Sequence, residues 1–161
     1  MAIRFQLLRQ EDVPMACQLI QDAGEWAPKS PIFDSPMDVL MKPRSQWMSA
    51  LSADELVGVV GFYDISWPDG TAAMFTGLVP KLRGRGFSLA LGKAQLDFAF
   101  NDMGLRRLEM SCLEGSPSAK LASKMGVKPE GRHPNTRLKA GKYHASVTFG
   151  LERSAYVVSK S

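Results

Sequence analysis

The fold of this chain is decided by the stretch Leu78-Val79-Pro80-Lys81-Leu82-Arg83-Gly84-Arg85-Gly86-Phe87-Ser88. It connects a strand that we expect over residues 71–79 to an amphipathic helix that we expect over residues 88–101. The first backbone N–H groups of a helix have no partner within it and carry a partial positive charge, so they bind phosphate well. Glycine just before such a helix lets an anion approach the backbone closely, and the two arginines add full charges. The stretch is therefore either an anion-binding loop or a tight turn whose arginines face solvent.

The spacing of the glycines excludes two common nucleotide-binding loops. The dinucleotide fingerprint Gly-x-Gly-x-x-Gly is absent, and so is the Walker pattern, which ends in Gly-Lys followed by Ser or Thr. The stretch belongs to neither class.

Patterns on either side of the stretch predict one α+β domain over residues 1–161. The expected strands are residues 3–8, 47–51, 56–65, 71–79, 105–113 and 143–153, and the expected helices are residues 10–24, 35–42, 88–101 and 117–125. Their order is β-α-α-β-β-β-α-β-α-β, with no internal repeat and no linker that would divide the chain.

Composition disfavours several other classes of protein. The chain is 45% hydrophobic and 22% charged, which is average for a soluble globular protein. No run approaches the about eighteen apolar residues of a membrane span, and residues 1–9 lack the pattern of a signal peptide. Cys17 and Cys112 are far apart and have no ligand-like neighbours. We therefore expect no disulfide framework, no metal site and a reducing, cytoplasmic location.

The formal net charge of +4 favours anionic ligands such as nucleotides, phosphates or acidic surfaces. Much of the basic excess lies in residues 81–85 and 120–142. It is either a solvated basic surface or a means of recruiting a ligand. We expect no dedicated nucleic-acid binding, because no basic stretch interleaved with aromatic residues and no known module is present.

A second block, Ser118-Ala119-Lys120-Leu121-Ala122-Ser123-Lys124-Met125-Gly126-Val127-Lys128-Pro129-Glu130-Gly131, favours the anion-binding interpretation. Together with Arg83-Gly84-Arg85-Gly86-Phe87-Ser88 it resembles the GNAT superfamily of acyl-CoA N-acyltransferases, over about residues 56–132. That family's signature is Gln/Arg-x-x-Gly-x-Gly/Ala, from which Ser88 departs while remaining small. Within the superfamily, the second block is most similar to the branch of ribosomal-protein N-terminal acetyltransferases.

The resemblance implies a mixed, mostly antiparallel central sheet with helices on both faces. It also implies an N-acetyltransferase that takes its acetyl group from acetyl-CoA and needs no metal. The backbone amides of residues 84–88 would hold the CoA pyrophosphate, and the preceding strand would pair with the pantetheine arm where it splays from the next strand. The residues that the resemblance assigns to CoA are Thr76, Gly77, Leu78, Arg83, Gly84, Arg85, Gly86, Phe87, Ser88 and Leu89.

The catalytic proton transfers are harder to assign from the sequence. The tyrosine with which the family often protonates the leaving thiolate is replaced by Ala122, and the family's asparagine is replaced by Gly115. The remaining candidates are Glu109, Ser118, Tyr143 and His144, with Tyr63 and Asp64 as weaker ones.

Each of these candidates has a structural alternative. Glu109 is equally an exposed strand carboxylate, Ser118 a helix cap, and Tyr143 and His144 surface or packed residues. Nothing near Cys112 indicates an activated nucleophile, so we expect direct transfer without a covalent intermediate.

The sequence says least about which amine is the acceptor. Acceptor sites in this family are built from the N-terminal helices and the last hairpin, here residues 25–48, with Trp26, Phe33 and Met41, and residues 137–143. The branch resemblance favours the α-amine of a protein, while a small-molecule amine or an aminoacyl-tRNA stays open, as does a homodimer. The alternative to an enzyme is a degenerate module that binds CoA as a sensor or an interaction partner.

Overall fold

The computed structural model describes residues 2–23 and 35–160, and it contains a seven-stranded sheet in the order β1-β2-β3-β4-β5-β7-β6. The strands are β1 Arg4–Leu7, β2 Gln46–Ser52, β3 Glu55–Ser66, β4 Thr71–Leu78, β5 Arg107–Leu113, β6 Lys128–Lys139 and β7 Lys142–Glu152. All neighbouring strands are antiparallel except β4 and β5, which are parallel. The expected mixed, mostly antiparallel sheet is confirmed.

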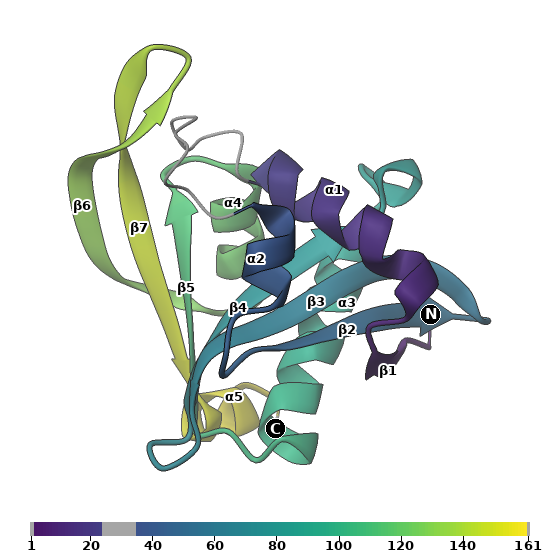
Figure 1. Ribbon diagram of the computed structural model, residues 1–161. Coiled ribbons are helices and arrows are strands. Elements are labelled where there is room, and N and C mark those ends of the chain that lie inside the picture. Colours follow the sequence, from purple (N-terminus) through teal and green to yellow (C-terminus); the bar gives the residue numbers. More distant parts are fainter. Residues whose placement is uncertain (1, 24–34, 161) are drawn as a thin grey trace.

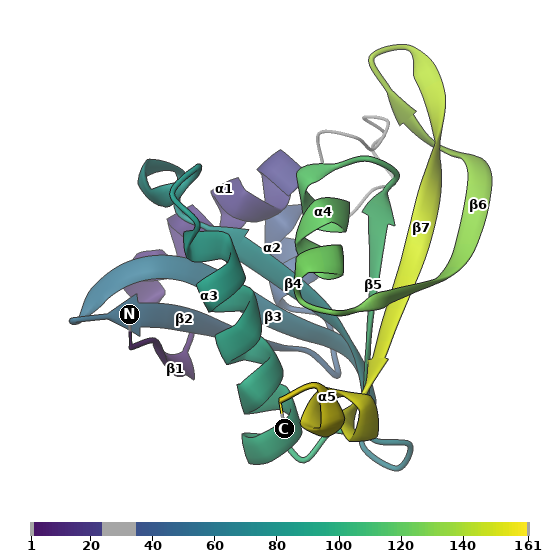
Figure 2. The same ribbon diagram turned by 180° about the vertical axis from the view of Figure 1, so that it is seen from behind.

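Helices cover both faces of the sheet. They are α1 Val13–Ala23, α2 Pro36–Leu40, α3 Phe87–Asp97, α4 Pro117–Lys124 and α5 Arg153–Lys160. Figure 1 shows α1 and α2 in front of the sheet, and Figure 2 shows α3 and α4 on the opposite face. No helix among residues 2–23 and 35–160 is long and apolar enough to cross a membrane.

The two helical layers explain why β3 is apolar along most of its length. Successive strand side chains point to opposite faces, and both faces are covered. Val59 packs with Leu19 of α1 and with Trp47, whereas Val60 belongs to the larger cluster that includes Leu91 of α3. The sheet therefore has a core on each side.

The long helix predicted over residues 88–101 is α3 with its continuation, a π-helical turn at Phe98–Asp102. Gly104 ends it with a φ of 70°, a left-handed conformation that glycine adopts without steric cost. Gly92 lies directly against the sulfur of Met125, which follows α4, so the absence of a side chain lets α3 and α4 pack closely.

Two elements were missed in the sequence, and the expected element order is corrected accordingly. β6 pairs with β7 in a long hairpin closed at Lys139 and Lys142, and α5 follows β7. Most of β6 is exposed and it contains two prolines, so it lacks the apolar alternation of a buried strand. The helix α5 is short, and it is held by Tyr156, which packs on Phe100.

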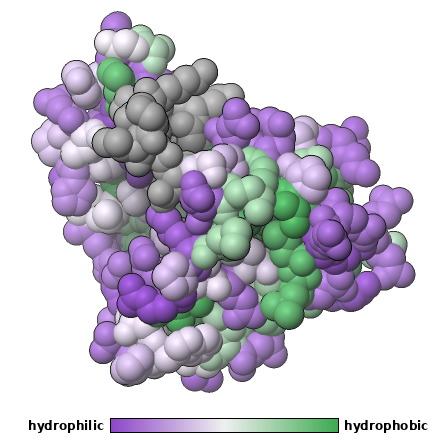
Figure 3. Space-filling view, in the orientation of Figure 1, coloured by the Kyte–Doolittle hydropathy of each residue, from purple (hydrophilic) through white to green (hydrophobic). Residues whose placement is uncertain are grey.

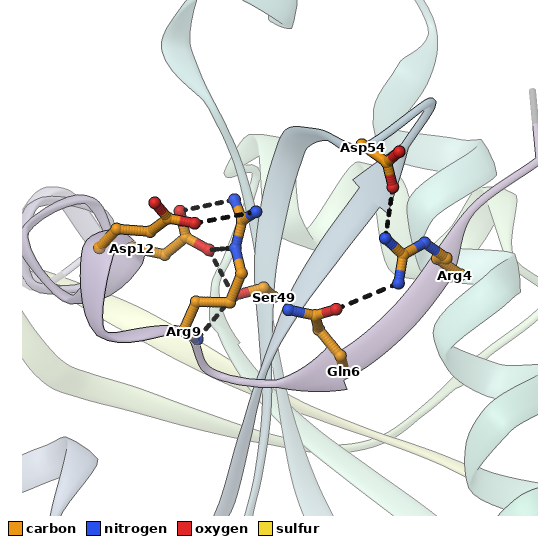
Figure 4. Close-up of polar contacts among 7 residues, drawn as sticks. Arg4, Gln6, Arg9, Asp12, Ser49 and Asp54 are labelled. Carbon is orange, nitrogen blue, oxygen red and sulfur yellow. Dashed lines mark hydrogen bonds and ion pairs between the residues drawn. The ribbon is translucent and has the colours of Figure 1, made fainter.

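Figure 4 shows a polar cluster that fixes the start of α1 on the sheet. The carboxylate of Asp12 accepts hydrogen bonds from the Arg9 guanidinium, at 3.0 Å from Nη2 to Oδ1, and from Ser49 Oγ at 2.7 Å. The Arg9 backbone N–H in turn donates to Ser49 Oγ on β2. Burial by itself raises the pKa of Asp12, but the hydrogen bonds from Arg9 and Ser49 outweigh it and leave that pKa below its ordinary value.

Candidate active site

A pocket of about 730 Å³ lies where β4 and β5 separate. The two strands pair only from Thr71 with Arg107 to Ala73 with Glu109. Beyond that point β4 stays with β3 as far as Leu78, while β5 stays with β7 as far as Leu113. Figure 1 shows them side by side at the bottom of the view and diverging upward. The separation thus follows from each strand keeping its antiparallel partner.

The edge of β4 that faces this gap presents unpaired main-chain groups. The Val79 N–H donates to the Val57 carbonyl, and hydrogen-bonded and non-hydrogen-bonded pairs alternate along an antiparallel ladder. The pairs Val60–Thr76 and Gly58–Leu78 are therefore non-hydrogen-bonded pairs. The N–H and C=O groups of Thr76 and Leu78 point away from β3 and into the gap, where an extended ligand can pair with them as a strand does.

The Thr76 side chain is held from the opposite side by α3. Its hydroxyl donates to Oε1 of Gln95 at 2.5 Å, and the Gln95 amide donates to the carbonyls of Gly61 and Phe75 at 3.2 and 3.0 Å. Gln95 is fully buried, so these bonds satisfy its amide and tie α3 to β3 and β4. The edge of β4 that faces the gap is thus held in place by Gln95 of α3.

The loop between β4 and α3 forms the end of the pocket. After a 3-10 turn at Pro80–Leu82, Gly84 and Gly86 have φ values of 75° and 80°, in the left-handed region that favours glycine. Gly86 caps α3, and as a glycine it has no side chain that could accept a hydrogen bond from the first turn of the helix. Apart from its chain neighbours, no described residue has an atom within 4 Å of where a Cβ on either glycine would lie. The helix N-terminus is therefore open to an anionic ligand.

Six of the ten residues assigned to CoA line the pocket: Thr76, Gly77, Leu78, Arg83, Gly84 and Ser88. Arg83 also pairs with Asp22 at the end of α1, at 3.4 Å. Of the other four, Arg85 and Gly86 are exposed on the loop, whereas Phe87 and Leu89 are partly buried against the core. The loop assignment itself stays a prediction.

Only one of the four catalytic candidates lies in the pocket. Ser118 lines it, and the cap of α4 is Ser116, whose Oγ accepts from the Ala119 N–H at 3.2 Å. The alternative in which Ser118 caps this helix is therefore wrong. Glu109 lies where β4 and β5 still pair, with its side chain 58% exposed beside Arg107, and it is not part of the lining.

Tyr143 and His144 lie in the β6–β7 hairpin, outside the pocket lining. Tyr143 is 68% exposed, and His144 is paired in register with Arg137. Arg137 does line the pocket, together with Asp22, Ser111 and Ser116, none of which was a catalytic or CoA candidate. Of the aromatic and methionine residues expected near an acceptor, Met41 is 75% exposed, and Trp26 and Phe33 lie outside the described residues.

Cys112 also lines the pocket, and its surroundings keep it protonated. The residue is 6% exposed, and burial raises the pKa of its thiol to about 11, against the opposing charge of Arg137. Since the thiolate is the nucleophilic form, Cys112 is a poor nucleophile at neutral pH.

This protonation state predicts slow alkylation of Cys112. In a Cys17→Ser variant, we expect iodoacetamide to modify Cys112 at pH 8 at least about 100-fold more slowly than it modifies a free thiol with a pKa near 8.5. The rate should rise about tenfold per pH unit as the pH approaches 11, because the thiolate fraction does so. Mass spectrometry over time measures both rates, and modification as fast as that of free cysteine would contradict the assignment.

Comparisons with known proteins agree with this architecture. The family model described as an acetyltransferase (GNAT) domain matches residues 3–128. A curated relative is the SPbeta prophage-derived uncharacterized N-acetyltransferase YokL of Bacillus subtilis (strain 168), 23% identical over 118 residues, which are 73% of this chain and 67% of that protein.

Among solved structures, mutant forms of the spermidine/spermine N-acetyltransferase SpeG from Vibrio cholerae superpose with a TM-score of 0.82 at 18% identity, covering 99% of this chain and 98% of that one. The spermidine N-acetyltransferase from Vibrio cholerae in complex with CoA and spermine superposes with a TM-score of 0.80 at 18% identity, covering 96% and 98%. At these identities the likeness establishes the fold.

Proposed function

Because the chain belongs to the GNAT acetyltransferase family and is an acyl-CoA-dependent N-acyltransferase, we propose that it moves an acetyl group from acetyl-CoA directly to a primary amine. The observation that carries the proposal is the pocket between β4 and β5, which runs from the glycine loop to the β6–β7 hairpin. A thioester and an amine can meet there because the strands have separated.

The donor half of the pocket suits CoA. We assign the pyrophosphate to the backbone N–H groups of residues 84–88, beside Arg83, and the pantetheine arm to the gap-facing main chain of Thr76 and Leu78. Three observations support this: the positive φ of both loop glycines, the open space at their Cβ positions, and an N-cap of α3, Gly86, that has no side chain to bond the first turn. The spermidine acetyltransferase solved with CoA has the same fold.

The reaction that we propose has a single acyl transfer. The neutral amine attacks the thioester carbonyl, the C–N bond forms, the C–S bond breaks, and the amine's proton passes to water. We assign the oxyanion that develops on the way to backbone N–H groups on the gap-facing edge of β4. The raised pKa of Cys112 supports direct transfer over an acyl-cysteine intermediate. Ser118, within the lining, is our candidate for donating a hydrogen bond to the departing thiolate.

The acceptor that we propose is a primary amine, either the α-amine of a protein or that of a small molecule. The first follows from the likeness of residues 118–131 to ribosomal-protein N-terminal acetyltransferases. The second is supported by the solved relatives, which acetylate spermidine or spermine. Both classes therefore belong in the test.

The proposal is tested by measuring free thiol released from acetyl-CoA in the presence of a panel of amines and peptides. We expect thiol release that depends on the acceptor, together with an N-acetylated product seen by mass spectrometry. Tight CoA binding without acceptor-dependent release from any member of the panel would show instead that the chain binds CoA without turning it over.

A further inference from the structure

Arg137 on β6 brings a positive charge to the pocket that no carboxylate of the described residues pairs with. The charged residues that line the pocket are Asp22, Arg83 and Arg137. The first two pair with each other beside the glycine loop. Within residues 2–23 and 35–160, no hydrogen bond or ion pair engages the guanidinium of Arg137, although it is half-buried. A half-buried guanidinium without a partner indicates a place for an anionic group.

A bulge in β6 sets the direction of the Arg137 side chain. His133 pairs with Ser146 and Arg137 with His144, so three residues of β6, 134–136, lie opposite the single residue Ala145. Asn135 has a φ of 54°, which asparagine tolerates better than most residues. Bulges bend a strand and redirect the side chains that follow. Arg137, the next residue along, is the one that reaches the pocket.

The hydroxyl of Thr136 holds the bulge in place. It donates to the His133 carbonyl at 2.9 Å and accepts from the Ser146 N–H at 3.2 Å. Because its only hydrogen is used on His133, the Ser146 hydroxyl is the donor in the 2.8 Å bond between the two side chains. These bonds cross the hairpin and fix the position from which Arg137 extends.

The carboxylates that the structure describes near Arg137 on the hairpin and its adjoining loop are engaged by other arginines. Residues 128–145 carry five basic side chains and one carboxylate, Glu130, which pairs with Arg107. Glu114 of the adjoining loop is taken by Arg132. Burial raises the pKa of the half-buried Tyr63 and of the buried Cys112, and the charge of Arg137 opposes both rises, so both groups lie within its field. The carboxylate of Asp64 acts on Tyr63 in the direction opposite to Arg137. Figure 3 shows a mostly hydrophilic surface at the upper left, where the hairpin lies.

We infer that the acceptor amine carries an anionic group, a carboxylate or a phosphate, which Arg137 binds while the amine faces the gap between β4 and β5. This inference rests on the proposed function. A polyamine is cationic along its whole length and would bring like charge against the guanidinium, which lowers affinity. Arg137 is thus a specificity-determining residue for acceptors that combine a primary amine with a negative charge.

The test compares acceptors in matched pairs: β-alanine with β-alaninamide, phosphoethanolamine with ethanolamine, and an acidic peptide with its neutral counterpart, with spermidine alongside. For the wild type we expect a kcat/KM at least about 10-fold higher for the anionic member of one pair, the range of a charge-assisted hydrogen bond. The carboxylate and phosphate pairs show which anion is bound. An Arg137→Gln variant should lose the preference and keep its rate with the neutral member, and Arg137→Lys should restore part of it.

Arg132→Gln is the matched control. It removes the same charge from the same strand, but Arg132 pairs with Glu114 and does not line the pocket, so the preference should persist. A wild-type preference for spermidine or for the neutral amines would overturn the inference while leaving the proposed acetyl transfer intact, and so would an unchanged preference in Arg137→Gln. If none of the amines stimulated thiol release, the proposed function would be overturned and this inference with it.

Discussion

Replacing Gly86 with glutamate is expected to abolish CoA binding and leave the protein folded. Gly86 caps α3 with a φ of 80°, and in the described part of the chain no atom beyond its two neighbours lies within 4 Å of where its Cβ would be. A glutamate side chain therefore fits sterically, but it places a carboxylate where we assign the pyrophosphate. We expect CoA affinity to fall at least about 100-fold, since like charges are brought together and backbone donors are obstructed. Isothermal titration with CoA measures the change.

Gly104→Glu is the control for this substitution. Gly104 has a φ of 70°, again with no atom within 4 Å of its Cβ position, and it follows the opposite end of α3. The left-handed conformation costs either glutamate about 1–2 kcal/mol. A carboxylate is also favourable at a helix N-terminus and unfavourable at the C-terminal end, so Gly86→Glu should be at least as stable as the control. If the two variants bound CoA equally well, the loop would not be the CoA site.

The local structure of residues 78–88 could be predicted from the sequence because the signals for a strand end, a glycine turn and a helix start are local, whereas the anion-binding interpretation also needed residues 118–131. The alternation of β4 and the glycine spacing both occur within a few neighbours, and the positive φ of Gly84 and Gly86 is the reason for glycine there. The same holds for the meander of β2, β3 and β4, because the turns between these strands contain residues that are typical of turns.

The part of the pocket to which we assign the acceptor could not be predicted, because it depends on pairing between distant residues. Arg137 was expected only as one end of residues 137–143, a stretch that the resemblance assigns to the acceptor, and the bond between Thr136 and Ser146 across the hairpin fixes the position from which it extends. Glu109 was chosen from its place in the strand, yet only the register with Ala73 shows that it precedes the point where the strands separate. A local signal for β6 did exist in Ala140-Gly141, whose positive φ values of 50° and 77° close a two-residue hairpin loop.

The substitution Asp12→Asn is expected to destabilise the protein. Asp12 is 5% exposed, and its carboxylate receives the Arg9 guanidinium and the Ser49 hydroxyl, which join the start of α1 to β2. An amide keeps one acceptor oxygen but turns an N–H₂ group toward a donor. Hydrogen bonds to a buried charge contribute about 1.5–3 kcal/mol, so we expect a loss of about 2–3 kcal/mol. For a chain of this length the melting temperature then falls by about 4–12 °C, which differential scanning calorimetry measures.

The pH dependence of this loss of stability shows whether the loss comes from the charge of Asp12 or from the shape of its side chain. The folded pKa of Asp12 lies below its ordinary value, so its contribution to stability is fully present above the unfolded pKa of about 3.9. As the pH falls further, the unfolded chain takes up a proton that the folded protein does not, and the contribution disappears through the folded pKa. Urea unfolding at pH 7, 5, 4 and 3 should therefore show the wild type and Asp12→Asn converging below about pH 4.

Asp54→Asn is the control for Asp12→Asn, because Asp54 pairs with Arg4 while its side chain is 85% exposed. Exposed ion pairs contribute little to stability, so this variant should have the same free energy of unfolding as the wild type at every pH. If the difference in unfolding free energy between the wild type and Asp12→Asn stayed constant from pH 7 to 3, the loss would come from packing and not from the charge of Asp12. Because α1 contributes Leu19, Asp22 and Ala23 to the pocket, a loosened start of α1 should also weaken CoA binding, more so near the melting temperature.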